Sequence, residues 1–303
     1  FQPRYTFYQQ KITLPTQYNN CQFSSNAWIN GGPGVNPTNE ANGSDTSLAA
    51  NGPFGGCYAD GEASLAVRKE LAAGPVNVSL VGYTLSYNTL DNNRMPTSGL
   101  FTELRQDFAG VGGDVNFIRT QVEARTYYEV ISDVVSVFKV QAGNISSWGG
   151  QQLRMLDSFQ MGPNLVRGFA PAGLGPRDLT PGTTNDPLGG SLYWGATVEA
   201  QTPLYFLPKD IGIKVAVFAD AGSLWSYQGP TSWNVTGETL QVGLNSASMI
   251  RSSVGVGFLW DSPLGPLRFD LAYPITKYCA TPVGGGEVCD RTQVFRFSGG
   301  TKF

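Results

Sequence analysis

Apolar and polar residues alternate along most of this chain, in segments of about ten residues separated by turn-forming residues. The clearest alternation covers residues 191–205, where Leu192, Trp194 and Val198 fall on one face and Glu199 falls on the other. Successive side chains of a β-strand point to opposite faces, so the pattern predicts strands with one apolar and one polar face. The sequence has no apolar run of about 18 residues, the length that a transmembrane helix requires.

The alternation predicts about ten antiparallel strands. They cover residues 1–13, 76–88, 98–109, 114–129, 133–147, 191–205, 211–226, 249–261, 265–277 and 291–302. Short turns mostly alternate with long connections, as at the two ends of an outer-membrane barrel. The long connections are 14–75, 149–190, 227–248 and 278–290. In the first of them, helix formers over 63–73 precede Gly74-Pro75, which predicts a short helix on the surface of that loop.

Composition favours a membrane-spanning barrel over a soluble sheet protein. Charged residues make up 14% of the chain, against about 25% in a typical soluble domain. Lipid on the apolar face and a lumen on the polar face account for both features, so the predicted fold is all-β, a transmembrane antiparallel β-barrel. The net charge of −3 leaves no basic surface that would indicate nucleic-acid binding.

Four cysteines lie in the predicted connections: Cys21, Cys57, Cys279 and Cys289. An even number in loops is typical of two disulfides in an oxidising compartment. Cys21–Cys57 with Cys279–Cys289 is the local pairing among three connectivities, and the alternative is that some are free thiols. Because the spacing is not CxxC and the chain has no histidine, we expect no metal site.

The absence of histidine also excludes Ser-His-Asp and Cys-His catalytic triads. Gly110-Val111-Gly112-Gly113 is a turn rather than a phosphate-binding loop, because no helix follows it. Glu199 and Asp220 could mimic an acid–base dyad, but an arginine between them would favour a structural role. We therefore expect neither an enzyme nor a bound cofactor.

That arginine is Arg167, in the run Asn164-Leu165-Val166-Arg167-Gly168-Phe169 of a long Gly/Pro-rich connection. Its planar, permanently charged guanidinium suits bidentate pairing with a carboxylate, and burial in a lumen would require such a partner. The alternation places Glu199 and Asp220 on the polar faces of two successive strands. The alternative, which composition alone favours, is an exposed arginine and two solvated acids.

The run Val166-Arg167-Gly168-Phe169, followed by Gly173-Leu174-Gly175-Pro176-Arg177, resembles the sixth extracellular loop of the BamA family of outer-membrane protein assembly factors. Further stretches resemble that family in the same order, and together they span about residues 76–303. They are Tyr87-Asn88-Thr89-Leu90-Asp91, Met95-Pro96-Thr97-Ser98-Gly99, Val217-Phe218-Ala219-Asp220-Ala221-Gly222, Asp261-Ser262-Pro263-Leu264-Gly265-Pro266-Leu267 and Phe295-Arg296-Phe297-Ser298-Gly299-Gly300-Thr301-Lys302-Phe303. The Arg-Gly-Phe core alone is a weak motif, whereas the ordered combination is specific.

This resemblance implies a barrel of about sixteen strands preceded by periplasmic POTRA domains. Residues 1–303 would then be the C-terminal part of the barrel, its last ten or so strands, with the upstream strands and POTRA domains outside the chain. The resemblance also implies the outer membrane of a Gram-negative bacterium as the location. The implied function is the folding and insertion of β-barrel proteins, without a cofactor, by lateral opening of the seam between the first and last strands and by membrane thinning. The implied partners are unfolded outer-membrane proteins, accessory outer-membrane lipoproteins and the lipid bilayer.

At the loop, the resemblance favours a buried and paired Arg167 over an exposed one. It implies that Arg167 meets Glu199 and Asp220 and pins the loop inside the lumen. Gly168 would permit a close backbone approach, and Phe169 would pack as an apolar plug. Val166 belongs to the same run.

The last predicted strand is the second candidate site. Phe295, Phe297, Gly299, Thr301 and Phe303 share one face, and this ending resembles the terminal recognition signal of outer-membrane barrels. The alternative is a lipid-facing strand with girdle aromatics. Gly299-Gly300 weakens side-chain packing, so we expect a weakly paired edge that offers backbone groups to a client strand.

Three other functions compete with this interpretation. A related transporter of the TamA or two-partner-secretion type shares the loop motif. A passive porin predicts an open lumen, steady ion conductance and no dependence on Arg167. An adhesive or structural barrel would use the long loops 14–75 and 227–248.

Overall fold

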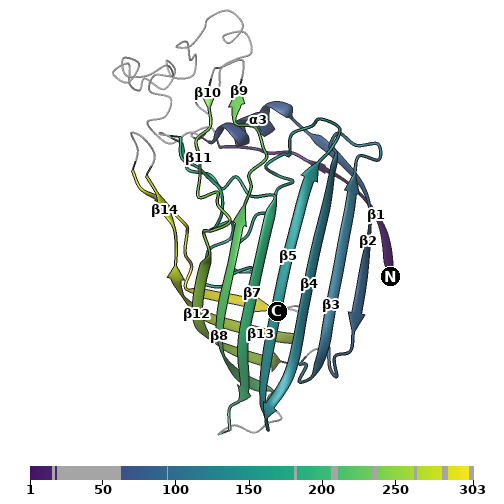
Figure 1. Cartoon of the computed structure of the whole chain (residues 1–303), viewed down its shortest axis with the longest axis vertical. Coiled ribbons are helices and arrows are strands. Elements are labelled where there is room, and N and C mark those ends of the chain that lie inside the picture. The colour runs from purple at the N-terminus through teal and green to yellow at the C-terminus, as the bar shows by residue number, and fades with distance from the viewer. Residues whose placement is uncertain are drawn as a thin grey trace, which may run out of the picture.

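The main feature of the structure, a computed structural model, is one curved antiparallel sheet of ten strands (Figure 1). Residues 1–15, 18, 63–93, 95–180, 183–205, 211–233, 238–262, 265–281 and 286–299 are described. The strands, in sheet order, are β1 (Gln2–Gln10), β2 (Val76–Asn88), β3 (Gly99–Ala109), β4 (Phe117–Ile131), β5 (Val134–Ser147), β7 (Leu192–Pro203), β8 (Ile213–Trp225), β12 (Arg251–Ser262), β13 (Gly265–Thr276) and β16 (Phe295–Gly299). The predicted all-β fold and its ten strands are confirmed.

Each of these strands pairs with its sequence neighbour in the sheet, which gives an up-and-down order. Short turns lie at one end of the sheet and the long connections lie at the other (Figure 1). β1 and β16 are the two edges, and within the described residues they do not pair with each other. Among those same residues, no helix is long and apolar enough to cross a membrane.

The two faces of the sheet differ as the alternation predicts. On β7, Glu199 is buried whereas the neighbouring Val198 is 51% exposed. The apolar side chains exposed on one face include Leu85, Val122, Val140, Val217, Val256 and Leu271. This face is the one that meets lipid, and the opposite face lines the lumen.

Apolar side chains fill the lumen at the end that carries the long connections. Val78, Phe117 and Ile145 point inward there, where the alternation alone would place polar residues. They pack against Leu165 and Phe169 of the loop between β5 and β7. Because the folded loop excludes water from this end, apolar side chains are favoured on both faces of the strands.

The long connections form a cap that is held together by short strands and one helix. β6 (Arg177–Asp178) pairs with β11 (Val242–Gly243), and β9 (Ser232–Trp233) pairs with β10 (Glu238–Thr239). β14 (Cys279–Ala280) pairs with β15 (Val288–Cys289). The helix α3 (Leu65–Ala73) lies where the sequence predicts it, and the Ser64 hydroxyl accepts a hydrogen bond from the Val67 N–H at its start.

The predicted surface position of α3 is wrong. Leu65 and Ala66 are buried against Leu188 and Leu240, which come from two other long connections. The sequence pattern of the helix is only weakly amphipathic because its buried face includes Arg68 and Glu70, which are charged. Arg68 Nε donates to the carbonyl of Ala63 just before the helix, and Glu70 accepts two hydrogen bonds from Arg154 of another connection.

The last strand begins later than predicted. The alternation suggested residues 291–302, whereas β16 covers Phe295–Gly299. Residues 291–293 lie extended but hydrogen-bond to the loop at 168–173 instead of to β13. Gly300, Thr301 and Phe303, assigned to the last strand, lie outside the described residues, as do Cys21 and Cys57.

Candidate functional site: the loop lock and the last strand

Local packing places the loop residue Arg167 in the lumen, on the inner face of the curved sheet. A turn begins at Gly162, whose carbonyl accepts hydrogen bonds from the N–H groups of Leu165 and Val166. Both side chains are buried against glycines of the sheet. A Cβ on Gly195 would lie 2.5 Å from Leu165 Cδ1, and a Cβ on Gly222 would lie 3.1 Å from Val166 Cγ2. These two strand glycines therefore provide the space in which the loop seats.

Gly168 and Phe169 fix the backbone on the other side of Arg167. Gly168 has φ of 88°, a left-handed conformation that other residues adopt at a cost. Its backbone lies so close to β13 that a Cβ would be 3.2 Å from the carbonyl oxygen of Ala272. Phe169 is fully buried in the apolar core of the lumen. The Arg167 side chain is thus held between two tightly packed neighbours.

Arg167 forms ion pairs with both predicted acids, and all three side chains are buried. Its Nε and Nη2 donate to the two carboxylate oxygens of Asp220, each at 2.7 Å, and its Nη1 donates to Glu199 Oε2 at 2.6 Å. The Arg167 backbone N–H also donates to Asp220, at 3.0 Å. The guanidinium carbon lies 3.4 Å from the centre of the Phe218 ring. We call Arg167, Glu199 and Asp220 the loop lock.

Two further residues complete the ion network, and sequence reasoning did not assign them to the site. Arg268 on β13 donates to both carboxylate oxygens of Glu199, at 2.9 and 2.7 Å, and its Nε donates to Asp270. The amide of Gln201 donates a further hydrogen bond to Glu199. Glu199 therefore accepts from the loop, from β13 and from its own strand. The signal was present in the sequence, because Arg268 and Asp270 alternate on the polar face of their strand.

The network joins two arginines and three carboxylates in a buried region. A buried charge is costly unless it is paired, and here every charged group faces at least one opposite charge. Removing one partner from such a network typically costs about 3–5 kcal/mol, because the remaining charge stays buried. The arrangement can hold a loop in one position, and it contains no nucleophile–base pair.

A cavity of about 600 Å³ adjoins the loop lock. Its wall includes Arg167 and Glu199, Lys139 from β5, and Arg296 from β16, and residues Leu90 and Met95 of the turn between β2 and β3 also line it. The lumen is thus open and charged beside the lock, but apolar and filled at the end that carries the cap.

Within the described part of the last strand, the second candidate site, β16, pairs with β13 from Phe295↔Leu271 to Gly299↔Leu267. Phe295 and Phe297 are exposed on the lipid-facing side, and the Phe297 ring packs at a tilt against Phe269, with ring centres 5.0 Å apart. A Cβ on Gly299 would meet Leu267 at 3.3 Å. The weakly paired edge stays a prediction.

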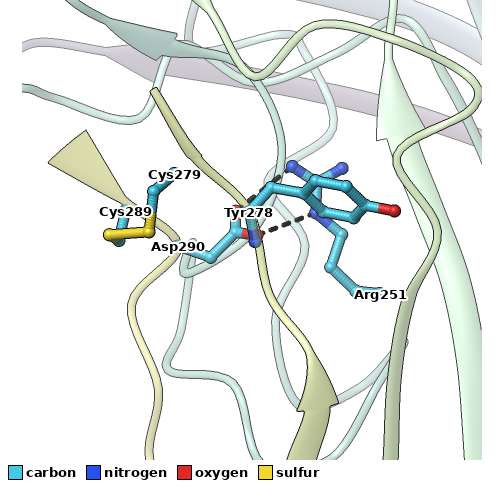
Figure 2. Close-up of a disulfide and its surroundings, with 5 residues drawn as sticks. All are labelled: Arg251, Tyr278, Cys279, Cys289 and Asp290. Atoms are coloured by element: carbon cyan, nitrogen blue, oxygen red, sulfur yellow. Dashed lines mark hydrogen bonds and ion pairs between the residues drawn. A yellow bond between two sulfur atoms is a disulfide. The ribbon is translucent and has the colours of Figure 1, made fainter. Parts of the chain in front are cut away.

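A disulfide lies in the connection that leads to β16. Cys279 and Cys289 are bonded across the β14–β15 hairpin (Figure 2). Next to it, the fully buried Arg251 donates to both oxygens of Asp290, at 3.0 and 3.2 Å. Figure 2 shows the ring of Tyr278 beside the guanidinium, with 5.2 Å between the Arg251 carbon and the ring centre. Glu287 is close to the sulfur atoms, but disulfide sulfurs are not thiolate ligands for a metal.

Burial shifts the pKa of Asp178, an acid of the cap that lies outside the membrane-spanning strands. Burial raises the pKa of Asp178 to about 6, although its carboxylate accepts a hydrogen bond from the Thr180 N–H. Asp178 lies in β6, where the loop between β5 and β7 pairs with the loop between β8 and β12. Asp178 is therefore an acid buried where these two loops meet.

Comparison with known proteins identifies the family. The sequence model described as the Omp85 superfamily domain matches residues 4–303. The chain belongs to the Omp85 superfamily. It is accordingly part of an outer-membrane β-barrel protein.

Individual Omp85 relatives are consistent with this assignment. The outer membrane protein assembly factor BamA of Neorickettsia risticii is 37% identical over 220 residues, which are 72% of this chain and 27% of that protein. The sorting and assembly machinery component 50 homolog of Bos taurus is 29% identical over 252 residues, which are 80% of this chain and 48% of that protein. The chain thus spans about a quarter to a half of these relatives.

Among solved Omp85 structures, that of BamA from Haemophilus ducreyi lacking POTRA domains 1–3 resembles this chain with a TM-score of 0.59. The match covers 74% of this chain and 42% of the other, at 23% identity. This similarity supports the barrel fold of the Omp85 chain.

Proposed function

We propose that the protein to which this chain belongs folds β-barrel proteins and inserts them into the outer membrane. The observation that carries the proposal is the loop lock: a buried loop arginine held by two strand carboxylates, in a chain of the Omp85 superfamily. Relatives from bacteria and animals are named as assembly components, and these names support the same proposal. Unfolded barrel proteins are the proposed clients, and accessory outer-membrane lipoproteins and the bilayer are the proposed partners.

In the proposed mechanism, the loop lock keeps the barrel rigid on the side of β7, β8 and β13. The weaker β16 edge separates from the first strand of the barrel, and its free N–H and C=O groups pair with a client strand. Membrane thinning beside the seam lowers the cost of insertion. No bond is made or broken covalently, so the proposal requires neither a catalytic residue nor a cofactor.

A passive porin is the main competing function. It requires a water-filled path through the lumen, whereas the end of the lumen that carries the cap is packed with Leu165, Phe169, Phe117 and other apolar side chains. Within the described residues, this packing favours an assembly factor over a diffusion pore. The related transporters would not accelerate the folding of a client barrel, so the liposome experiment below distinguishes them from an assembly factor.

The test uses the full-length protein in liposomes. The folding of an unrelated outer-membrane barrel is timed with wild type, with Arg167→Ala and with Arg105→Gln. Arg105 is a lumenal arginine that bonds Asp107, away from the lock, and is the control. We expect acceleration by wild type and by the control, and little or none by Arg167→Ala. The absence of acceleration by wild type, together with steady ion conductance, would contradict the proposal and favour a pore or transporter.

A further inference from the structure

The last strand is attached to the loop that carries the lock as well as to β13. Arg291, just before β16, forms two backbone hydrogen bonds with the loop. Its carbonyl accepts from the Ala170 N–H at 2.9 Å, and its N–H donates to the Gly173 carbonyl at 2.8 Å. The Gln293 N–H donates to the carbonyl of Gly168, again at 2.9 Å. The segment 291–293 therefore forms a short ladder with the residues that follow Arg167, and it continues directly into the seam strand.

A side chain of β16 contacts the same loop on the other side of the lock. Arg296 Nη1 donates to the carbonyl of Pro163, and its Nη2 donates to Asn164 Oδ1, both at 2.7 Å. Asn164 is also held from β5, because Gln141 Nε2 donates to its carbonyl at 2.8 Å. The guanidinium thus spans two acceptors three and four residues before Arg167, a geometry that suits the fixed fork of arginine.

The start of β16 makes more contacts than its end does among the described residues. The start is bonded to β13, to the loop backbone through 291–293 and to the loop through Arg296. The end, at Gly299, is bonded to β13 alone within the described residues. The start of β16 is therefore tied to the loop as well as to the sheet, and it separates only if both sets of contacts break.

We propose that Arg296 is a positioning residue that couples the seam strand to the loop lock. Its two hydrogen bonds to Pro163 and Asn164 keep the start of β16 attached to the loop. Breaking the lock loosens the seam strand, and removing Arg296 loosens the loop. This inference rests on the proposed function for its purpose, but the coupling itself is measurable without any client.

Hydrogen exchange of the full-length protein in liposomes, read by mass spectrometry, tests the coupling. In Arg296→Gln we expect exchange to rise roughly tenfold at Ala170 and Gln293, whose amides bridge the loop and residues 291–293. The control Arg105→Gln removes the same charge from the lumen and should change neither amide. Unchanged exchange in Arg296→Gln, or an equal rise in the control, would overturn the proposal.

Coupling must act in both directions. Arg167→Gln should therefore raise exchange along Phe295–Gly299, although the hydrogen bonds of Arg167 go to Asp220 and Glu199 and not to this strand. If Arg167→Gln does not fold, Arg167→Lys, which keeps the charge, is measured in its place. Wild-type exchange along β16 in a folded lock variant would refute the coupling.

Client folding separates positioning from simple loss of stability. If both arginines act on one mechanical unit, the double variant Arg167→Gln/Arg296→Gln should slow client folding no more than the worse single variant. Multiplicative slowing would show independent actions and overturn the inference. If even wild type does not accelerate client folding, the proposed function fails, and the exchange experiment still decides whether the coupling exists.

Discussion

The loop lock and the last strand touch the same loop, but they hold it by different means. At the lock, a buried ion network joins the loop to β7, β8 and β13, and β7 and β8 are paired with each other over 12 residues. At β16, the described residues pair with β13 over five positions, and the side-chain contacts to the loop are hydrogen bonds from Arg296 to two uncharged acceptors, one partly buried and one exposed. Under the proposed function, this difference would give one barrel a rigid side and a weaker seam.

The largest expected effect is at the lock. Arg167→Ala leaves Asp220 and Glu199 buried with less compensation, so we expect a loss of about 3–5 kcal/mol in unfolding free energy. Thermal unfolding, followed by the loss of the compact form on unheated gels, measures the change. The control Arg105→Gln should unfold close to wild type, because that side chain is 46% exposed. A melting temperature of Arg167→Ala equal to that of the control would show that the lock contributes no stability.

The second prediction concerns pH and distinguishes the cap from the lock. The pKa of Asp178 is raised by burial from 3.8 to about 6. The favourable contribution of the protonated acid is therefore fully present below about pH 4, and it is lost as pH rises through 6. Asp178→Asn removes this dependence, so above pH 6 the variant should be more stable than wild type by on the order of 2–3 kcal/mol.

Melting curves between pH 4 and 8 test this prediction. The curves of wild type and Asp178→Asn should meet near pH 4 and separate above pH 6. Parallel curves over the whole range would contradict it. In the structure the amide oxygen of asparagine can still accept the hydrogen bond from the Thr180 N–H, so the variant changes charge more than it changes contacts.

A smaller effect is expected from Gly168→Ala, beside the lock. The left-handed backbone and the nearby Ala272 carbonyl oppose an added Cβ, which costs about 1–3 kcal/mol. Gly112 also has positive φ, but a Cβ there would meet nothing within 4 Å, so Gly112→Ala measures the backbone strain alone. Thermal unfolding should show a larger loss for Gly168→Ala. Equal losses would mean that the close approach to β13 has no energetic role.

The smallest effect is expected on the last strand. Phe297→Ala removes one aromatic contact with Phe269 on the lipid-facing side, worth about 0.5–1.5 kcal/mol. Hydrogen exchange along β16 should increase, while the melting temperature of the whole barrel changes little. A loss as large as that of Arg167→Ala would remove the proposed contrast between a rigid side and a weak seam.

Periodicity was sufficient for the sheet because it depends on local geometry. Strands alternate their side chains whatever surrounds them, so all ten strands were predictable, and the turn at 132–133 lies where the alternation breaks. The ends of strands were harder. Residues 291–293 are extended and alternate like a strand, but their backbone partner is the loop at 168–173 and not β13.

The position of α3 could not be predicted for a similar reason. Its sequence marks a helix with a clear stop at Gly74, but Leu188 and Leu240, which bury it, lie more than a hundred residues away along the chain. The two acids of the lock could be predicted from the sequence, because Glu199 and Asp220 occupy the polar faces of neighbouring strands. Arg268 and Asp270 occupy such a face too, yet the sequence does not reveal which polar residues come level with the loop.

The sequence by itself determined the strands, their two faces, the even set of cysteines and the run around Arg167. Each of these depends on residue type and spacing, and both are visible along the chain. Only the tertiary structure decided that Arg268 shares Glu199 with Arg167, that Arg251 pairs with Asp290 beside the disulfide, and that Arg296 reaches Pro163 and Asn164. Strand register and loop entry bring these groups together, and both are set by long-range packing that no local pattern records.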